Sequence, residues 1–271
     1  MHSCPITSRS VDLFAVVNAS PDSLNTDSIV SGPAEAVARA TAMLAQGADG
    51  LDLGGQGSTD AAEVVGWETE WARLVDVVPA LAALGVPLSV DTWRPQVARR
   101  AIEAGATVLN AADGMQSDEM WAVAAECDVP IVVPFLSGPN PREMQHVTAD
   151  PVDTIVEFFD ARLADADRFG MRHRCIIDPG TGFAPSNWAW EDRYRYQKMV
   201  YSNLDQLRRW DLPLYIALPW KDTPQHWELM EIVLRQQPEY GRVHYPDQVR
   251  ALERKLGLGS PVLNGHGSVD Q

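Results

Sequence analysis

Residues 86–112 read VPLSVDTWRPQVARRAIEAGATVLNAA and hold one complete repeat of the pattern that decides the fold. An apolar run at each end, VPLSVDT and ATVLNAA, flanks a segment of helical period at 95–104. Pro95 suits the first turn of a helix, and Gly105 suits the position just after its end. The stretch therefore predicts a strand, a helix and a second, parallel strand.

The same alternation continues along almost the whole chain. We predict strands at 11–18, 50–55, 86–92, 106–112, 129–135, 174–180, 212–218 and 241–244. Helical period occurs at 33–46, 95–104, 150–169 and 225–236, and 187–199 either starts a helix or forms a long loop. Eight strand–helix units in about 250 residues predict an α/β fold, a single-domain (β/α)₈ TIM barrel. A doubly wound open sheet is the alternative.

The composition is that of a globular protein with a sizeable core. The chain has 271 residues, of which 45% are hydrophobic and 22% are charged. A linker rich in Ser or Gly would mark a boundary between domains, and the sequence contains none. We therefore expect one barrel domain at 11–256, with a flexible N-terminus at 1–10 and a flexible tail at 257–271.

The charge balance restricts the partners. Lys and Arg number 22 against 37 Asp and Glu, a formal net charge of −15, which repels nucleic acid and anionic membranes. An uncharged run of about 18 residues, as a membrane span requires, is missing, and so is a secretory signal. The three cysteines, Cys4, Cys127 and Cys175, are too scattered for disulfides or a zinc site. We expect a cytoplasmic protein with no nucleic-acid or membrane partner.

Polar residues stand at the carboxyl ends of the predicted strands, where a strand covered on both faces should be apolar. They are Asn18, Asp52, Asp91, Asn110, Asp178 and His244, with Lys221 just after the seventh strand. In a barrel these ends form one rim, so the side chains would converge. Each alone has a structural alternative: Asn18 in a turn, Asp91 as a helix cap, Asp52 bonded to its own loop. Together, two carboxylates and an amide suit a heterocycle rich in N–H groups.

Basic residues gather near the last two strands. Lys221, Arg242 and His244 occupy the region where barrels commonly bind phosphate, and the planar fork of an arginine suits two oxyanions. The alternatives are a surface ion pair for Arg242 and a hydrogen-bonded structural role for His244. Trp220 either stacks on a substrate ring or walls the cup, whereas Trp190 lies in a helical segment and is expected to pack.

Seven motifs in order resemble the dihydropteroate synthases of the pterin-binding superfamily, from Asn18 to His244. NASPDS at 18–23 is similar to N-x-T-P-D-S, and DLGGQGST at 52–59 is similar to D-x-G-G-E-S-T. The others are SVDT at 89–92, the strand with Asn110, DPGTGF at 178–183, Lys221, and RVH at 242–244.

The resemblance implies a transferase in which an aryl amine displaces pyrophosphate from 6-hydroxymethyl-7,8-dihydropterin diphosphate. It places the pterin at Asp91, Asn110, Asp178 and Lys221, with Asp91, Asp178 and Lys221 as the catalytic residues. It places pyrophosphate at Asn18, Arg242 and His244, with Mg²⁺ at Asn18, and the nucleophile at Ser58, Thr59, Phe183 and Trp220. It also implies a homodimer.

The sequence departs from the family pattern mainly in the nucleophile half. Gln56 replaces Glu, Gly57 is inserted, Asp60 replaces Arg, and Pro219 and Trp220 replace Ser and Arg. The nucleophile is therefore para-aminobenzoate or a different amine. Two other functions fit the motifs: a catalytically inactive pterin-binding homologue, and a methyltetrahydrofolate-binding methyltransferase domain.

Overall fold

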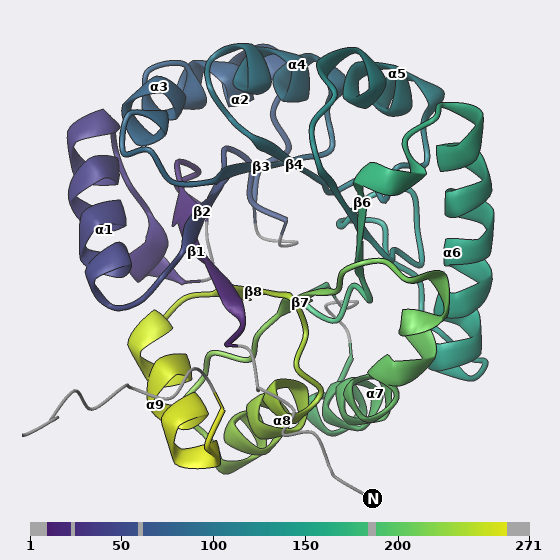
Figure 1. Ribbon diagram of the computed structural model, residues 1–271. Helices are drawn as coiled ribbons and strands as arrows, with labels where there is room; N and C mark the ends of the chain where they lie inside the picture. The colour runs from purple at the N-terminus through teal and green to yellow at the C-terminus, as the bar shows by residue number, and fades with distance from the viewer. Residues whose placement is uncertain (1–9, 23–24, 59–61, 184–187, 259–271) are drawn as a thin grey trace, which may run out of the picture.

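The computed structural model describes residues 10–22, 25–58, 62–183 and 188–258. Within these residues, eight parallel strands form one sheet that is ringed by helices (Figure 1). The strands are β1 (Asp12–Asn18), β2 (Gly50–Gly54), β3 (Leu88–Thr92), β4 (Val108–Ala111), β5 (Ile131–Pro134), β6 (Cys175–Asp178), β7 (Tyr215–Ala217) and β8 (Tyr240–Val243).

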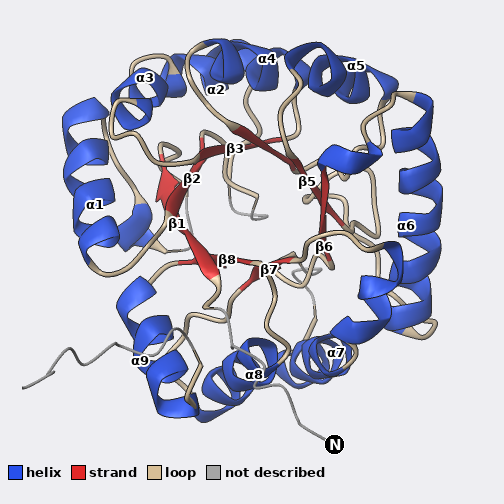
Figure 2. Cartoon of the chain, viewed as in Figure 1, coloured by secondary structure: helices blue, strands red, loops and turns tan. Residues whose placement is uncertain are grey.

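The helices follow the strands along the chain and form the outer layer (Figure 2). They are α1 (Pro33–Ala45), α2 (Trp67–Leu74), α3 (Val77–Ala82), α4 (Pro95–Glu103), α5 (Asp118–Cys127), α6 (Pro151–Arg168), α7 (Trp190–Ser202), α8 (Pro224–Arg235) and α9 (Pro246–Leu256), with 3₁₀ turns at Thr26–Ser28, Arg172–Arg174 and Leu204–Trp210. Proline begins α1, α4, α6, α8 and α9, where its missing N–H costs no hydrogen bond. The predicted helices match α1, α4, α6 and α8 to within one residue at each end.

Strand pairing closes the sheet into a barrel. The order is β6-β5-β4-β3-β2-β1-β8-β7, so the first strand lies between the second and the eighth. A parallel bridge between Ile177 on β6 and Leu214 before β7 joins the two ends, with the Ile177 N–H donating to the Pro213 carbonyl at 2.8 Å. The predicted (β/α)₈ barrel is therefore confirmed, and the doubly wound alternative is wrong.

Apolar side chains fill the interior of the barrel near the amino ends of the strands. Phe14, Val108, Val132, Ile176 and Tyr215 form a buried cluster, and Phe14 meets Tyr215 edge to face at 5.8 Å between ring centroids. Gly50 makes room for this ring, because a Cβ there would lie 3.0 Å from the Phe14 ring. These apolar side chains fill the part of the interior near the amino ends of several strands, so we expect the site at the carboxyl ends.

Several expectations fall on residues that the structure does not describe. The predicted flexible ends at 1–10 and 257–271 lie almost entirely outside the described residues, and so does Thr59. At 187–199, where the sequence predicts a helix start or a loop, α7 begins at Trp190. Across the described residues, the helices are too short or too polar to cross a membrane.

Candidate active site

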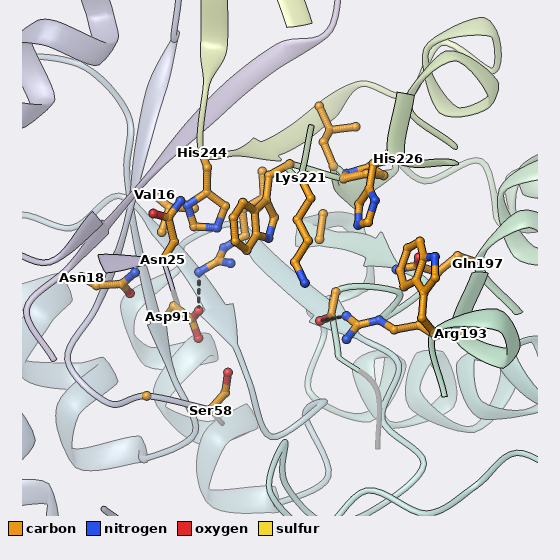
Figure 3. Close-up of a pocket in the computed structure, with 18 of the residues that line it drawn as sticks. Val16, Asn18, Asn25, Ser58, Asp91, Arg193, Gln197, Lys221, His226 and His244 are labelled. Carbon is orange, nitrogen blue, oxygen red and sulfur yellow. Dashed lines mark hydrogen bonds and ion pairs between the residues drawn. The ribbon is translucent and has the colours of Figure 1, made fainter. Parts of the chain in front are cut away.

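A cavity of about 220 Å³ opens at the carboxyl ends of the strands (Figure 3). Residues from the strand ends and from the loops after β1, β2 and β7 line it, and so do residues of α7 and α8. Of the residues predicted from the sequence, those in its lining are Asn18, Ser58, Asp91, Trp220, Lys221, Arg242 and His244. Segments that are far apart in sequence thus meet at one rim, as the strand-end pattern predicted.

Acidic and amide side chains from neighbouring strands lie together below the cavity. Parallel register aligns Asp91 on β3 with Asn110 on β4. Asn110 donates from Nδ2 to Oδ1 of the fully buried Asp52 at 3.3 Å. Asp178 at the end of β6 is buried too, and its Oδ1 accepts the Gly180 N–H at 2.8 Å. Asn110 and Asp178 do not themselves line the cavity; Asn110 is bonded to Asp52, and Asp178 lies close enough to Asp52 and Arg242 for their charges to affect its pKa.

Arg242 on β8 ties this cluster together. Its Nε donates to Asp52 Oδ2 at 2.5 Å, and its Nη2 donates to Asp91 Oδ2 at 3.0 Å. One predicted alternative for Arg242 was a surface ion pair. The arginine does form ion pairs, but they lie inside the barrel and not on the surface. Asp91 does not cap α4, whose N-cap residue is Arg94. Asp52 bonds Arg242 and Asn110 across the barrel, so its predicted alternative as a loop-bonding residue is wrong.

Burial changes the acidity of these carboxyl groups. It raises the pKa of Asp178 to about 7, against the opposing effects of the Gly180 N–H and of Arg242. It also raises the pKa of Asp91 to about 7, although the Arg242 guanidinium opposes the shift. The floor of the cavity is thus a set of acids that can accept hydrogen bonds and hold a proton near neutral pH.

A second group of polar residues lies to one side of Asp91. Asn18, Asn25 and His244 are on this side in Figure 3. Asn18 donates from Nδ2 to Ser28 Oγ at 2.7 Å, so it also holds the loop after β1. His244 Nδ1 is buried and has no hydrogen-bond partner in the described part of the chain, so its predicted alternative as a hydrogen-bonded structural histidine is not supported at this atom. Burial and the nearby Arg242 lower the pKa of His244 to about 3, so its ring is neutral.

The opposite wall contains residues that the sequence analysis did not assign to the site. Trp190, Arg193 and Gln197 on α7 and His226 on α8 line the cavity there. Trp190 stacks on His226 at 4.3 Å between centroids, in agreement with its expected packing role, and it also lines the cavity. The three α7 residues are spaced i, i+3 and i+7, the spacing of one helix face, which is the signal that could have identified them.

The residues predicted to bind the nucleophilic substrate differ in their placement. Ser58 and Trp220 line the cavity, whereas Phe183 does not. Gln56, which replaces the family's Glu, is bonded to its own loop: its Nε2 donates to the Glu63 carbonyl at 2.8 Å, and its Oε1 accepts the Val65 N–H at 3.0 Å. This residue therefore shapes the loop after β2.

The residues present suit a metal ion that keeps few protein ligands. The described residues contain no cluster of three or more His, Cys, Asp or Glu side chains that could hold one. Asn18 offers one neutral oxygen at the rim. A hard cation such as Mg²⁺ commonly takes one or two protein oxygens and draws the rest from phosphates and water, and this donor set fits that mode.

The fold and this cavity define a barrel enzyme with a site for a small, polar heterocycle. The family of pterin binding enzymes matches residues 14–218, and the chain belongs to this family.

Individual relatives agree with the family. A dihydropteroate synthase of Synechocystis sp. is 34% identical over 210 residues, covering 76% of this chain and 70% of the relative. A dihydropteroate synthase type-2 of Escherichia coli is 32% identical over 220 residues, covering 79% of this chain and 78% of the relative. The structure of dihydropteroate synthase from Thermus thermophilus in complex with 4-aminobenzoate superposes with a TM-score of 0.75 at 27% identity, covering 92% of this chain and 94% of that one.

Proposed function

We propose that the protein is a transferase of the dihydropteroate synthase type. It binds 6-hydroxymethyl-7,8-dihydropterin diphosphate, and an aryl amine, para-aminobenzoate or a relative, displaces pyrophosphate to form dihydropteroate or its analogue. One observation carries the proposal: Asp91, Lys221, Arg242 and His244 line one cavity at the strand ends, and the buried Asn110 and Asp178 adjoin the same Asp52–Arg242 cluster.

The acids and the amide suit the pterin ring. A pterin presents an amino group and ring N–H groups on one edge, and Asp91, Asn110 and Asp178 supply the matching acceptors. Lys221 at the wall supplies a donor for the ring's carbonyl oxygen or nitrogen. Asp52 accepts a hydrogen bond from the Asn110 Nδ2 group, which fixes the orientation of this amide.

The cations suit the departing group. When the C–O bond to the diphosphate breaks, negative charge grows on the pyrophosphate and positive charge on the pterin methylene. Arg242 stabilises the negative charge on the pyrophosphate, and Asn18 and His244 bind the same group by donating hydrogen bonds or coordinating its metal ion. Asp91 and Asp178 stabilise the positive charge on the methylene. The amine nitrogen then forms the C–N bond and loses one proton. A Mg²⁺ ion at Asn18 would neutralise diphosphate charge.

The test is turnover by the full chain with Mg²⁺, the pterin diphosphate and 4-aminobenzoate, followed as pyrophosphate release and dihydropteroate formation. We expect turnover in the wild type and a loss of about 100-fold in kcat/KM for Asp178→Asn, since a charged hydrogen-bond acceptor becomes an amide. Asp205→Asn is the matched control, because Asp205 is exposed in the 3₁₀ turn Leu204–Trp210.

Calorimetry separates this proposal from an inactive pterin-binding homologue. Tight binding of 6-hydroxymethylpterin without pyrophosphate release across a panel of aromatic amines would identify the homologue and refute the transferase. The homodimer, the identity of the metal as Mg²⁺ and the cytoplasmic location stay predictions; light scattering of the purified chain checks the first of these.

A further inference from the structure

In the described part of the chain, two cations on the α7 side of the cavity have no acidic partner. Arg193 comes from the first turns of α7, and Lys221 follows β7; both line the cavity. Neither of them forms an ion pair within the described residues, whereas many other arginines do. In a chain with a net charge of −15, two such cations on one wall form a local attraction for an anion.

The guanidinium of Arg193 is held in place with donors to spare. Its Nη2 donates to the Gly182 carbonyl at 3.2 Å, and Figure 3 shows the side chain extending into the cavity. Its Nε is buried and has no hydrogen-bond partner in the part of the chain that the structure describes. Burial lowers the pKa of Arg193 from its usual value, and the opposing effect comes from Tyr201 and not from a carboxylate. A buried donor without a partner is costly, and a bound anion would relieve that cost.

The residues beside Arg193 make the wall suitable for an aromatic ring. The rings of Trp190 and His226 are parallel to within 3°, and His226 Nδ1 is hydrogen-bonded to Thr223 Oγ1 at 2.7 Å. Burial, Lys221 and Arg193 all lower the pKa of His226, so this ring is neutral and adds no charge of its own. The wall therefore combines a flat aromatic pair with a cation.

This wall is distinct from the one assigned to the diphosphate. In Figure 3, Asn18 and His244 lie on the opposite side of Lys221 from Arg193. An anion at Arg193 is thus separate from pyrophosphate held at Asn18 and His244. Of the two substrates, the amine is the one left to supply it.

We propose that Arg193 is a specificity-determining residue for the second substrate: beside Lys221, its guanidinium binds the carboxylate of an aromatic amine whose ring lies against Trp190 and His226. The planar fork of arginine matches a carboxylate by two parallel hydrogen bonds, and a neutral amide cannot use it as well. This inference rests on the proposed transfer reaction, and it adds the residue that selects among amines.

The test compares 4-aminobenzoate with the neutral isostere 4-aminobenzamide at saturating pterin diphosphate. Arg193→Met keeps much of the length of the side chain and removes its charge. We expect it to lower kcat/KM for 4-aminobenzoate by at least about tenfold, mainly through KM, and to leave 4-aminobenzamide within about twofold. Arg193→Lys should keep part of the preference, because a point charge replaces the fork.

The matched control is Arg195→Met, two positions along α7, where the side chain is 76% exposed and pairs with Asp192. This variant should leave kcat/KM unchanged for both 4-aminobenzoate and 4-aminobenzamide. Equal losses for both amines in Arg193→Met would overturn the proposal. So would a raised KM for the pterin diphosphate, which would assign Arg193 to pyrophosphate, or a wild type that does not prefer the carboxylate.

A binding measurement separates the failure of this inference from that of the proposed function. If the wild type releases no pyrophosphate with any amine, the reaction assignment fails. Calorimetry of 4-aminobenzoate against 4-aminobenzamide, in the presence of 6-hydroxymethylpterin and pyrophosphate, then still decides the subsite. A loss of 4-aminobenzoate affinity of about tenfold in Arg193→Met supports it, and unchanged affinity refutes it.

Discussion

Asp52 on β2 and Arg242 on β8 form an ion pair inside the barrel across a separation of 190 positions in the sequence, with 2.5 Å between Oδ2 and Nε. The same arginine reaches Asp91, and the same aspartate accepts a hydrogen bond from Asn110. The group expected to hold the diphosphate is thus joined to the groups expected to hold the ring. We therefore expect binding at one end of the cavity to depend on the charge state of the other.

Replacing Asp52 should destabilise the fold. Asp52→Ala leaves the Arg242 guanidinium with one acidic partner in place of two, and breaking a buried ion pair costs about 3–5 kcal/mol. We expect a loss near the lower end of this range in the free energy of unfolding, measured with urea. Glu231→Ala, which breaks the exposed Glu231–Arg235 pair on α8, should change it by no more than about 0.5 kcal/mol. Similar losses for both variants would contradict the importance of the interior pair.

Replacing Arg242 should weaken both halves of the substrate. Arg242→Ala leaves the Asp52 and Asp91 carboxyl groups buried without their cation. Because Arg242 opposes the rise in the pKa of Asp91, its removal should favour the protonated form of Asp91, which is a weaker acceptor. We expect at least about tenfold weaker binding of 6-hydroxymethylpterin, and a larger loss for its diphosphate. Calorimetry with the two ligands measures this, and an unchanged affinity for the unphosphorylated pterin would show that the coupling is absent. The affinities of Arg242→Lys for both ligands should lie between those of the wild type and those of Arg242→Ala.

Pterin binding should depend on pH through Asp178. Its pKa is about 7 in the folded chain, so the carboxylate that accepts from the ring forms only as the pH rises to that value. The affinity should increase by up to about tenfold per pH unit below pH 7 and level off above it. Calorimetry of the wild type and Asp178→Asn between pH 5.5 and 8.5 provides the comparison. The variant should have a shallower slope, because Asp91, whose pKa is also raised to about 7, is then the remaining contributor of the two.

The same group affects stability in the ligand-free protein. Its pKa is raised from 3.8, so the folded state holds a proton that the unfolded chain has released. The contribution of Asp178 to the free energy of unfolding is complete below pH 3.8 and is lost as the pH rises through about 7. Urea unfolding at pH 5 and pH 8 should therefore show a wild-type decline that Asp178→Asn reduces.

His244 should take up a proton when the diphosphate binds. Burial and the neighbouring cations keep its pKa at about 3, and an anion placed beside its ring would favour the charged form. At pH 6 the binding enthalpy of the pterin diphosphate should vary with the ionisation enthalpy of the buffer. His244→Gln should lower the number of protons taken up with the diphosphate. The proton exchange on binding of the unphosphorylated pterin, which reflects Asp178, should be the same in both proteins.

Local sequence signals predicted most of the fold because the turn chemistry is explicit. Pro95 and Gly105 bracket α4, and similar prolines begin four other helices, so the element ends could be located closely. The polar strand ends Asp91, Asn110 and Asp178 were identifiable because a carboxylate or amide is unfavourable in a strand buried on both faces. The closure of the barrel then brings them together.

The partners within the site could not be predicted in the same way. The sequence predicted that Arg242 lies at the rim of the barrel. Its pairing with Asp52, however, depends on the length of its side chain and on which strands face each other across the interior. Arg193 and Trp190 lie on an amphipathic helix, where an arginine and a tryptophan have the appearance of ordinary surface and packing residues. Their spacing places them on one helix face with Gln197, and the position of α7 against the cavity shows that this face lines the site.

The bridge between Ile177 and Leu214, one pairing within the described residues where β1 and β2 have five, makes the junction of β6 and β7 the weakest seam of the barrel. Thermal fluctuations that separate neighbouring strands begin where the fewest backbone bonds must break, so amide hydrogens here should exchange with deuterium earlier than those of β1. The chain between these two strands is the one that forms α7. The wall that holds Arg193 therefore belongs to the segment that connects the two most weakly paired strands of the barrel.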